Sequence, residues 1–255
     1  MFPLKDKVVI LTGASQGIGA KLAALLLLKG AKLSLAARDE TLLRQVAGSS
    51  DSLVCSGDLT EASTRTCVIE QTLQRWGRID VLINNAGRGS YYSLAESSES
   101  ETRAVFDLNF FAPLALTQLA IPHLEKTRGS LVNVSSMAGQ INLPWMSIYS
   151  ASKSALSSLT AGERVEFRRR GIHVMGVFPG YIDTEFQSHA PGPRPPSQVA
   201  RARRFAVSAE VCATAIVRGL ELQKTSVVTP SWGWLLVWGN RLMPGIVEKR
   251  LGSLQ

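Results

Sequence analysis

Residues 7–30 read KVVILTGASQGIGAKLAALLLLKG, and this stretch decides the fold that we expect. Residues 7–12 form a continuous apolar run after a charged start, which is typical of a strand buried inside a parallel sheet. A glycine-rich turn (residues 13–19) follows at once, and residues 20–29 have a helical composition that ends at Gly30. In this order of strand, turn and helix, glycines let the backbone approach a pyrophosphate, which the unpaired N–H groups at the helix start can bind. The stretch therefore predicts a nucleotide site, against the simpler interpretation of a tight turn packed with small residues.

The composition is that of a globular protein with a sizeable core. Of the 255 residues, 45% are hydrophobic and 19% are charged. A net charge of +8 favours an anionic partner, such as a phosphorylated cofactor, an anionic lipid surface or a nucleic acid. Nucleic acid is not expected, because no basic run is interleaved with aromatic residues. The three cysteines, Cys55, Cys67 and Cys212, show neither metal-ligand spacing nor a disulfide framework, so we expect no metal site and a reducing, cytoplasmic location.

The rest of the chain alternates between strand-like apolar runs and helical patterns. Strands are expected at residues 32–37, 52–55, 79–83, 130–135, 173–178 and 226–229. Helices are expected at residues 61–76, 101–126, 149–169 and 209–222. This alternation predicts one α/β domain over residues 1–255, a Rossmann-type doubly wound parallel sheet of about seven strands with helices on both faces. A ligand should lie across the carboxyl ends of these strands.

A second stretch, residues 131–153, carries groups suited to proton transfer. It reads LVNVSSMAGQINLPWMSIYSASK and places Ser136 just after a strand, Tyr149 farther along, and Lys153 four residues beyond Tyr149. Residues four apart share a helix face, so the phenol and the ammonium should point into the same space. Taken singly, each of these three residues could instead be ordinary packing between sheet and helix.

Together these motifs resemble those of the short-chain dehydrogenase/reductase family. The chain has the spacing Gly-x3-Gly-x-Gly after Thr12, the tetrapeptide Asn-Asn-Ala-Gly at residues 84–87, and a Pro-Gly-x-x-x-Thr segment at residues 179–184. The resemblance covers nearly the whole chain and is to NADP(H)-preferring carbonyl reductases and hydroxysteroid dehydrogenase-like members. It implies an enzyme that transfers hydride between NADP(H) and a carbonyl or secondary alcohol.

The resemblance assigns catalytic roles to Asn109, Ser136, Tyr149 and Lys153. Tyr149 would exchange the proton with the substrate oxygen, and Ser136 would polarise the carbonyl. Lys153 would lower the pKa of Tyr149 and hold the nicotinamide ribose. Asn109 would order a water molecule on the path from Lys153 to solvent, next to a bend in its helix. Its apolar neighbours favour burial over a solvent-facing position.

The end of the second expected strand indicates which dinucleotide is bound. NAD-preferring members of the family carry an acidic residue there, whereas here Ala37 is followed by Arg38. An arginine can pair with a 2′-phosphate, so we expect NADP(H), although Arg38 could instead pair with Asp39 in solvent. Asp58, assigned to the adenine, could alternatively cap the next helix. The cofactor residues that the resemblance implies are Gly13, Ser15, Gln16, Gly17, Ile18, Gly19, Arg38, Asp58, Leu59, Asn85, Ala86, Gly87, Tyr149, Lys153, Pro179, Gly180, Ile182 and Thr184.

Several segments are assigned to the substrate and to partners. Residues 185–208 are expected to form a lid, and residues 230–255 form an apolar tail that carries three tryptophans. The tail could be a wall of the pocket, a dimer contact or a peripheral membrane contact, and its character favours a lipophilic carbonyl substrate. Relatives usually form homo-oligomers through helices that match residues 101–126 and 149–169, so a homo-oligomer is expected. The expected substrate contacts are Ser136, Gln140, Trp145, Met146 and Tyr149.

Three other functions compete with a carbonyl reductase. A 3-oxoacyl-[acyl-carrier-protein] reductase would need a basic docking face, for which Arg201, Arg203 and Arg204 are the one hint. A redox sensor that binds NADP(H) without turnover would lack the tyrosine or the lysine, and both are present here. The third alternative is a membrane-surface scaffold that uses the apolar tail.

Overall fold

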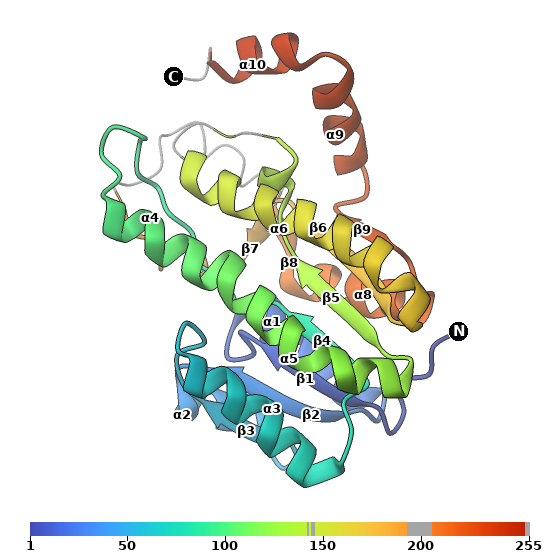
Figure 1. The fold of residues 1–255 in the computed structure, drawn as a ribbon. Coiled ribbons are helices and arrows are strands. Elements are labelled where there is room, and N and C mark those ends of the chain that lie inside the picture. Colours follow the sequence, from blue (N-terminus) through green and yellow to red (C-terminus); the bar gives the residue numbers. More distant parts are fainter. Residues whose placement is uncertain (142, 144–145, 193–205, 253–255) are drawn as a thin grey trace.

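Seven parallel strands form the central sheet of the computed structural model, which describes residues 1–141, 143, 146–192 and 206–252 (Figure 1). Their order is β3-β2-β1-β4-β5-β6-β9, which confirms the doubly wound parallel sheet expected from the sequence. The strands are β1 (Val8–Thr12), β2 (Lys32–Ala37), β3 (Leu53–Ser56), β4 (Val81–Asn84), β5 (Ser130–Val134), β6 (His173–Pro179) and β9 (Ser226–Thr229). A separate two-stranded sheet pairs β7 (Ile182–Asp183) with β8 (Val207–Ser208).

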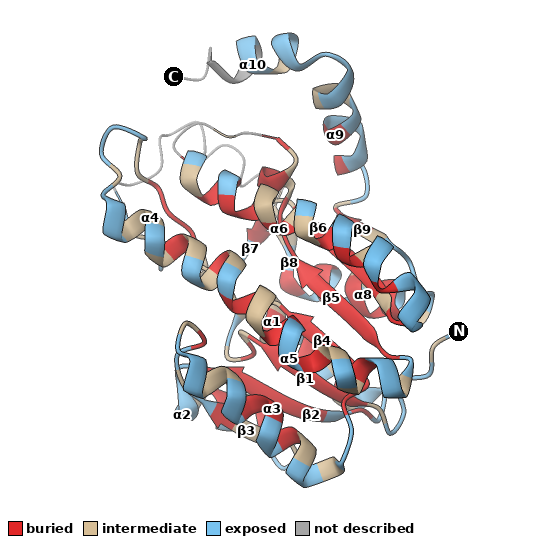
Figure 2. Cartoon of the chain, viewed as in Figure 1, coloured by how far each residue is buried: buried red, intermediate tan, exposed pale blue. Residues whose placement is uncertain are grey.

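Helices cover both faces of the sheet, and each face buries its own apolar core (Figure 2). Along β1, Val9 and Leu11 enter one core while Ile10 enters the other, which explains why the strand reads as a continuous apolar run. Helices α1 and α8 pack together on one face, and α3 and α5 lie on the other. The helices are α1 (Gly17–Leu28), α2 (Glu40–Ala47), α3 (Ala62–Trp76), α4 (Glu99–Phe106), α5 (Ala112–Thr127), α6 (Ser147–Glu166), α8 (Ala209–Glu221), α9 (Gly233–Leu242) and α10 (Pro244–Gly252).

The helix expected over residues 101–126 is interrupted. A π-helical segment, Asp107–Phe111, separates α4 from α5, so the irregularity lies around Asn109. Pro122 lies within α5 and does not end it. π-Helical turns are rare and often occur at functional sites, because the extra residue redirects the side chains of that turn.

The whole run Glu99–Thr127 is long and apolar enough to cross a bilayer by length and composition alone. In the fold it is a covering helix of the domain. Leu116, Ala120 and Leu124 of α5 are buried in the core with residues of β4 and β5.

The sequence interpretation missed helix α2 and the two tail helices. The start of α2 had a recognisable signal, because the Asp39 carboxylate accepts a hydrogen bond from Leu42 N at 2.9 Å. Asp39 therefore caps this helix, in contrast to the alternative in which it pairs with Arg38.

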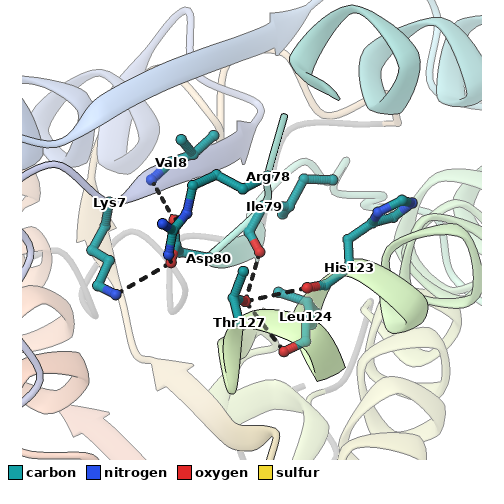
Figure 3. A network of polar contacts seen from close by, with 8 residues as sticks. All are labelled: Lys7, Val8, Arg78, Ile79, Asp80, His123, Leu124 and Thr127. Atoms are coloured by element: carbon teal, nitrogen blue, oxygen red, sulfur yellow. Dashed lines mark hydrogen bonds and ion pairs between the residues drawn. The ribbon is translucent and has the colours of Figure 1, made fainter. Parts of the chain in front are cut away.

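The amino ends of β1 and β4 are fixed by one buried carboxylate (Figure 3). Asp80 accepts hydrogen bonds from Val8 N at 3.0 Å, from Arg78 Nε at 2.9 Å and from Lys7 Nζ at 3.2 Å. Burial acts to raise the pKa of Asp80, but these hydrogen bonds outweigh it and hold the pKa below its usual value. Thr127 Oγ1 donates to Ile79 O at 2.8 Å and ties the end of α5 to the same region. The register set here brings the turns after β1 and β4 side by side at the opposite, carboxyl end.

A buried polar chain links β4, β5 and α6. Asn84 Nδ2 donates to Asn133 Oδ1 at 2.9 Å, and Asn133 Nδ2 donates to Glu163 Oε2 at 2.7 Å. Burial raises the pKa of Glu163 to about 7, although the Asn133 hydrogen bond acts in the opposite direction. Glu163 therefore holds a proton in the fold at pH values at which an exposed glutamate is ionised.

We predict that Glu163→Gln makes the stability of the fold less dependent on pH. Because the folded pKa is raised, the stabilisation is complete below the unfolded pKa of about 4.3 and is lost as the pH rises through about 7. The wild-type protein should lose on the order of 3 kcal/mol of unfolding free energy by this route between pH 5 and pH 9, and the variant should lose much less. Urea denaturation at several pH values measures this. The exposed Glu70→Gln serves as the control and should follow the wild type. Parallel curves for the wild type and Glu163→Gln would contradict the assignment.

Candidate active site

A cavity of about 1340 Å³ lies across the carboxyl ends of the strands. It is larger than a usual drug-sized pocket of about 300–1,000 Å³, so it has room for a dinucleotide together with a second molecule. All eighteen cofactor residues assigned from the sequence line it, from Gly13 through Thr184. The structure therefore brings the glycine turn, Arg38, the 84–87 turn, the amino-terminal turns of α6 and the 179–184 segment around one space.

The start of α1 is suited to an anion. Gly13 and Gly17 have φ angles of +63° and +54°, which side chains rarely adopt. A Cβ at Gly19 would overlap the carbonyl oxygen of Gly13, so only glycine lets the helix start so close to the turn. The N-cap residue Gln16 makes no side-chain capping bond, and no acidic residue lies in the first turn. The first N–H groups and the positive end of the helix dipole are therefore available to a pyrophosphate.

One hydroxyl joins the turn after β1 to the turn after β4. Thr12 Oγ1 accepts hydrogen bonds from Asn85 N at 2.9 Å and from Ala86 N at 3.0 Å. In return Asn85 Nδ2 donates to Thr12 O at 3.0 Å and to Gly13 O at 3.1 Å. These bonds hold the glycine turn against the floor of the cavity.

Arg38 and Asp58, which the resemblance assigns to the cofactor, both line the cavity. Asp58 Oδ1 accepts from Thr60 N at 2.9 Å, while α3 begins later, at Ala62, with Glu61 as its N-cap residue. Asp58 thus closes a local turn and does not cap α3. The backbone hydrogen bond from Thr60 is the main cause that lowers the pKa of Asp58, and Arg38 and Arg88 lower it further.

Helix α6 carries Tyr149 and Lys153 into the cavity wall. Both are buried, at 7% and 3% exposure. Lys153 Nζ donates to Val134 O at 3.0 Å, and Ser135 Oγ donates to Lys153 O at 2.8 Å. The carboxyl end of β5 therefore fixes both the backbone and the ammonium of Lys153. Ser136 follows directly and hydrogen-bonds Tyr149.

The pKa shifts of this pair correct one expectation. Burial raises the pKa of Tyr149 to about 12, and the hydrogen bond from Ser136 acts in the lowering direction. Burial lowers the pKa of Lys153 to about 8. The sequence interpretation had Lys153 lowering the pKa of Tyr149, but here the ammonium is directed to the Val134 carbonyl and desolvation dominates both groups. At neutral pH the protein alone keeps Tyr149 protonated, which is the state that a proton donor needs.

Asn109 is fully buried in the π-helical segment and does not line the cavity. Its Nδ2 donates to Ser152 Oγ and to Arg88 O, both at 3.0 Å, and its Oδ1 accepts from Arg88 N at 2.9 Å. Gly87 separates it from the cavity lysine. A Cβ at Gly87 would lie 3.1 Å from Asn109 Oδ1 and 3.3 Å from Lys153 Nζ, so the glycine leaves the space between those two groups open.

Next to Tyr149 the cavity is apolar. Tyr91, Ala138, Met146 and Tyr149 form a buried cluster, and Phe186 packs against it with its ring 6.0 Å from that of Tyr149. Tyr91 N donates to Pro191 O at 2.9 Å, which ties the first part of the expected lid to this wall. The sequence interpretation found Met146 but missed Tyr91 and Phe186. Both lie in segments without regular periodicity, so no sequence signal placed them here.

One expected substrate contact is not found in the wall, and another lies outside the described residues. Gln140 does not line the cavity, because its Oε1 accepts from Arg241 Nη2 at 3.2 Å and its carbonyl accepts from Asn240 Nδ2 at 3.0 Å. Trp145 lies outside the described residues, as do residues 193–205 of the expected lid with Arg201, Arg203 and Arg204. Among the residues that the structure describes, no cluster of three or more His, Cys, Asp or Glu could hold a metal ion.

Comparison with known proteins agrees with this geometry. Residues 7–192 match the family model for short chain dehydrogenases. The chain is 37% identical over 256 residues to the 11-beta-hydroxysteroid dehydrogenase-like protein 4A of Arabidopsis thaliana, with 96% of this chain and 83% of that protein covered. It is 36% identical to 11-beta-hydroxysteroid dehydrogenase A of Sesamum indicum, with 95% and 73% covered.

Solved structures give the same picture. A short-chain dehydrogenase/reductase from Burkholderia phymatum in complex with NAD superposes with a TM-score of 0.88 at 24% identity, with 96% of each chain covered. A short-chain dehydrogenase from Burkholderia cenocepacia in complex with NADP superposes with a TM-score of 0.82 at 27% identity, with 98% of this chain and 99% of that chain covered. The first similarity, at 24% identity, supports the fold alone. Because one structure contains NAD and the other NADP, the dinucleotide preference has to be inferred from the residues of this chain.

We predict that Thr12→Val destabilises the fold. Valine keeps the shape of threonine but leaves the N–H groups of Asn85 and Ala86 without their acceptor, which should cost roughly 1–3 kcal/mol. Urea denaturation measures the change in unfolding free energy. Thr12→Ser retains the hydroxyl and should recover most of the loss. Equal stability of the valine and serine variants would show that the hydroxyl does not link the two turns.

Proposed function

Because the chain belongs to the short-chain dehydrogenase family, and so is an oxidoreductase of carbonyl and alcohol groups, we propose that it reduces a lipophilic ketone with NADPH, or runs the reverse oxidation with NADP⁺. One observation carries the proposal. Tyr149, which is buried, stands with Ser136 and Lys153 in the same cavity as the glycine turn and beside an apolar wall.

The residues divide the chemistry between them. The nicotinamide, when bound, supplies or accepts the hydride. Tyr149 gives its proton to the carbonyl oxygen as negative charge develops there, and Ser136 donates a hydrogen bond to the same oxygen. Lys153, whose ammonium donates to Val134 O, lines the cavity and would hold the nicotinamide ribose. Asn109 positions the segment around Lys153 through Ser152 and the Arg88 backbone.

The proposal of NADP(H) rests on the end of β2. Arg38 is exposed and lines the cavity directly after the small residue Ala37. Asp39 is occupied as the cap of α2, and no salt bridge of Arg38 occurs among the described residues. A guanidinium in this place can bind a 2′-phosphate, and Ser15 lines the same part of the cavity.

A lipophilic substrate is supported by the wall and by the relatives. The apolar side chains that pack around Tyr149 include those of Tyr91, Met146 and Phe186, which provide uncharged contact area. The similar plant proteins are named as hydroxysteroid dehydrogenases, whose substrate class has a secondary alcohol on an apolar skeleton. Both observations favour a bulky apolar ketone over a sugar.

We predict that Tyr149→Phe abolishes ketone reduction while cofactor binding remains. Loss of a positioned proton donor should lower kcat by roughly 10²–10⁴-fold. NADPH consumption with a panel of ketones, including steroids and 3-oxoacyl esters, measures the rate, and quenching of tryptophan fluorescence measures NADPH binding. Tyr92→Phe, which removes a hydroxyl outside the cavity lining, should keep the wild-type rate. Turnover by Tyr149→Phe at the wild-type rate would remove Tyr149 from the mechanism.

We predict that Arg38→Ala raises the KM for NADPH roughly 10- to 100-fold, the effect expected when a hydrogen bond to a charged group is lost. The KM for NADH, which has no 2′-phosphate, should change little. The matched control is Arg44→Ala, which removes an exposed arginine of α2 that pairs with Glu40. Equal effects on the two cofactors, or equal wild-type rates with NADH and NADPH, would contradict NADP(H) preference.

A further inference from the structure

The tail forms an arm of two helices, α9 and α10, that projects from the body of the domain (Figure 1). In α9 only Gly233 and Val237 are buried, and every residue of α10 whose side chain is described is exposed or half-buried (Figure 2). An arm so little covered by its own domain has apolar surface available to something else.

The outward face of α9 is a continuous apolar stripe. Trp234, Leu235, Trp238 and Leu242 fall within about 100° of arc at 100° per residue. Their side chains are between 36% and 75% exposed. The stripe continues past the end of α9 through Met243 and Ile246, which are 53% and 64% exposed.

Other residues of the arm reach the cavity. Trp232 and Leu236 line it, so the apolar surface runs from the stripe to the cavity mouth. The arm is also tied to the loop that follows Ser136. The side chains of Asn240 and Arg241 donate hydrogen bonds to Gln140. Helix α9 also packs closely on this loop, because a Cβ at Gly233 would lie only 2.7 Å from Met137 Sδ.

We propose that the α9–α10 arm docks on an anionic lipid surface and that an apolar substrate enters the cavity from that surface along Trp232 and Leu236. The entrance route rests on the proposed function, whereas the docking does not. Tryptophans beside leucines are suited to the bilayer interface, where the rings lie at the level of the headgroups. The arm exposes two basic residues, Arg241 and Lys249, against one acidic residue, Glu248, and the whole chain carries a net charge of +8, which complements anionic headgroups.

A second copy of the chain is the competing occupant. A protein seated on the stripe would lie beside the cavity mouth, because the stripe and the mouth share α9. A lipid surface in the same place instead supplies apolar molecules to that mouth. Continuity between the stripe and the cavity therefore favours the lipid surface.

The test is vesicle co-sedimentation of the full chain. Vesicles of phosphatidylcholine alone are compared with vesicles that also contain phosphatidylserine, at low and high salt. The wild type should sediment with the anionic vesicles, less so at high salt, and its tryptophan emission should shift to the blue. The double variant Leu235→Ser/Trp238→Ser should partition at least about tenfold more weakly. Val165→Ser, which removes a 77% exposed apolar side chain from α6, should behave as the wild type.

Each result decides the proposal. Absence of wild-type binding, or equal binding by the double variant, would overturn it. So would a fall in oligomer mass for the double variant, measured by light scattering, without any loss of vesicle binding, because a second copy would then be the occupant. The rate of reduction of a water-soluble ketone separates lipid docking from the proposed function. The double variant should keep that rate, while failure of every ketone with vesicle binding intact would refute only the proposed function and the entrance route.

Discussion

The attachment of α6 to the carboxyl end of β5 is the contact on which the proposed chemistry depends. The Val134 carbonyl receives the Lys153 ammonium, and Ser135 holds the Lys153 carbonyl. Because Tyr149 lies one helical turn before Lys153, these two bonds also set where the phenol stands. Ser136, two residues beyond the end of β5, then lies beside the phenol, and its hydroxyl also accepts a hydrogen bond from Ala138 N at 3.1 Å. A shift of α6 along the sheet would therefore displace all three groups together.

Burial shifts the pKa values of both Tyr149 and Lys153. Desolvation moves the pKa of Tyr149 upward and that of Lys153 downward, so each group is pushed toward its neutral form. For a ketone reductase this is useful in the phenol, which must carry its proton until charge develops on the substrate. The same low-polarity wall suits an apolar ketone. The π-helical segment supports the position of Lys153, because the Asn109 amide donates a hydrogen bond to Ser152, the residue before Lys153.

Local sequence patterns predicted the order of strands and helices but not all of the side chains that line the cavity. The run of residues 7–30 predicted strand, turn and helix because each of these depends on nearby residues, and the structure has all three. The bend expected next to Asn109 from the family resemblance is present, but its form, a π-helical turn, was not predicted, because the local pattern is otherwise helical. Gln140 is predicted to contact the substrate, yet its side chain accepts a hydrogen bond from Arg241 of α9, about one hundred residues later in the chain. The direction of the Tyr149 pKa shift likewise depends on burial by distant segments, which no spacing along the chain reveals.

In the proposed mechanism, hydride passes between the nicotinamide of a dinucleotide, whose pyrophosphate the glycine turn binds, and a carbonyl carbon held beside Tyr149. Transfer of deuterium tests it most directly. A lipophilic ketone is incubated with the protein and with NADPH deuterated at the transferring C4 position, and the product is analysed by mass spectrometry and NMR. The product expected from this mechanism is an alcohol with one deuterium on the carbinol carbon, formed with a single stereochemistry. NADPH that binds in the cavity while no tested ketone gains deuterium, or an alcohol whose new hydrogen comes from solvent, would contradict it.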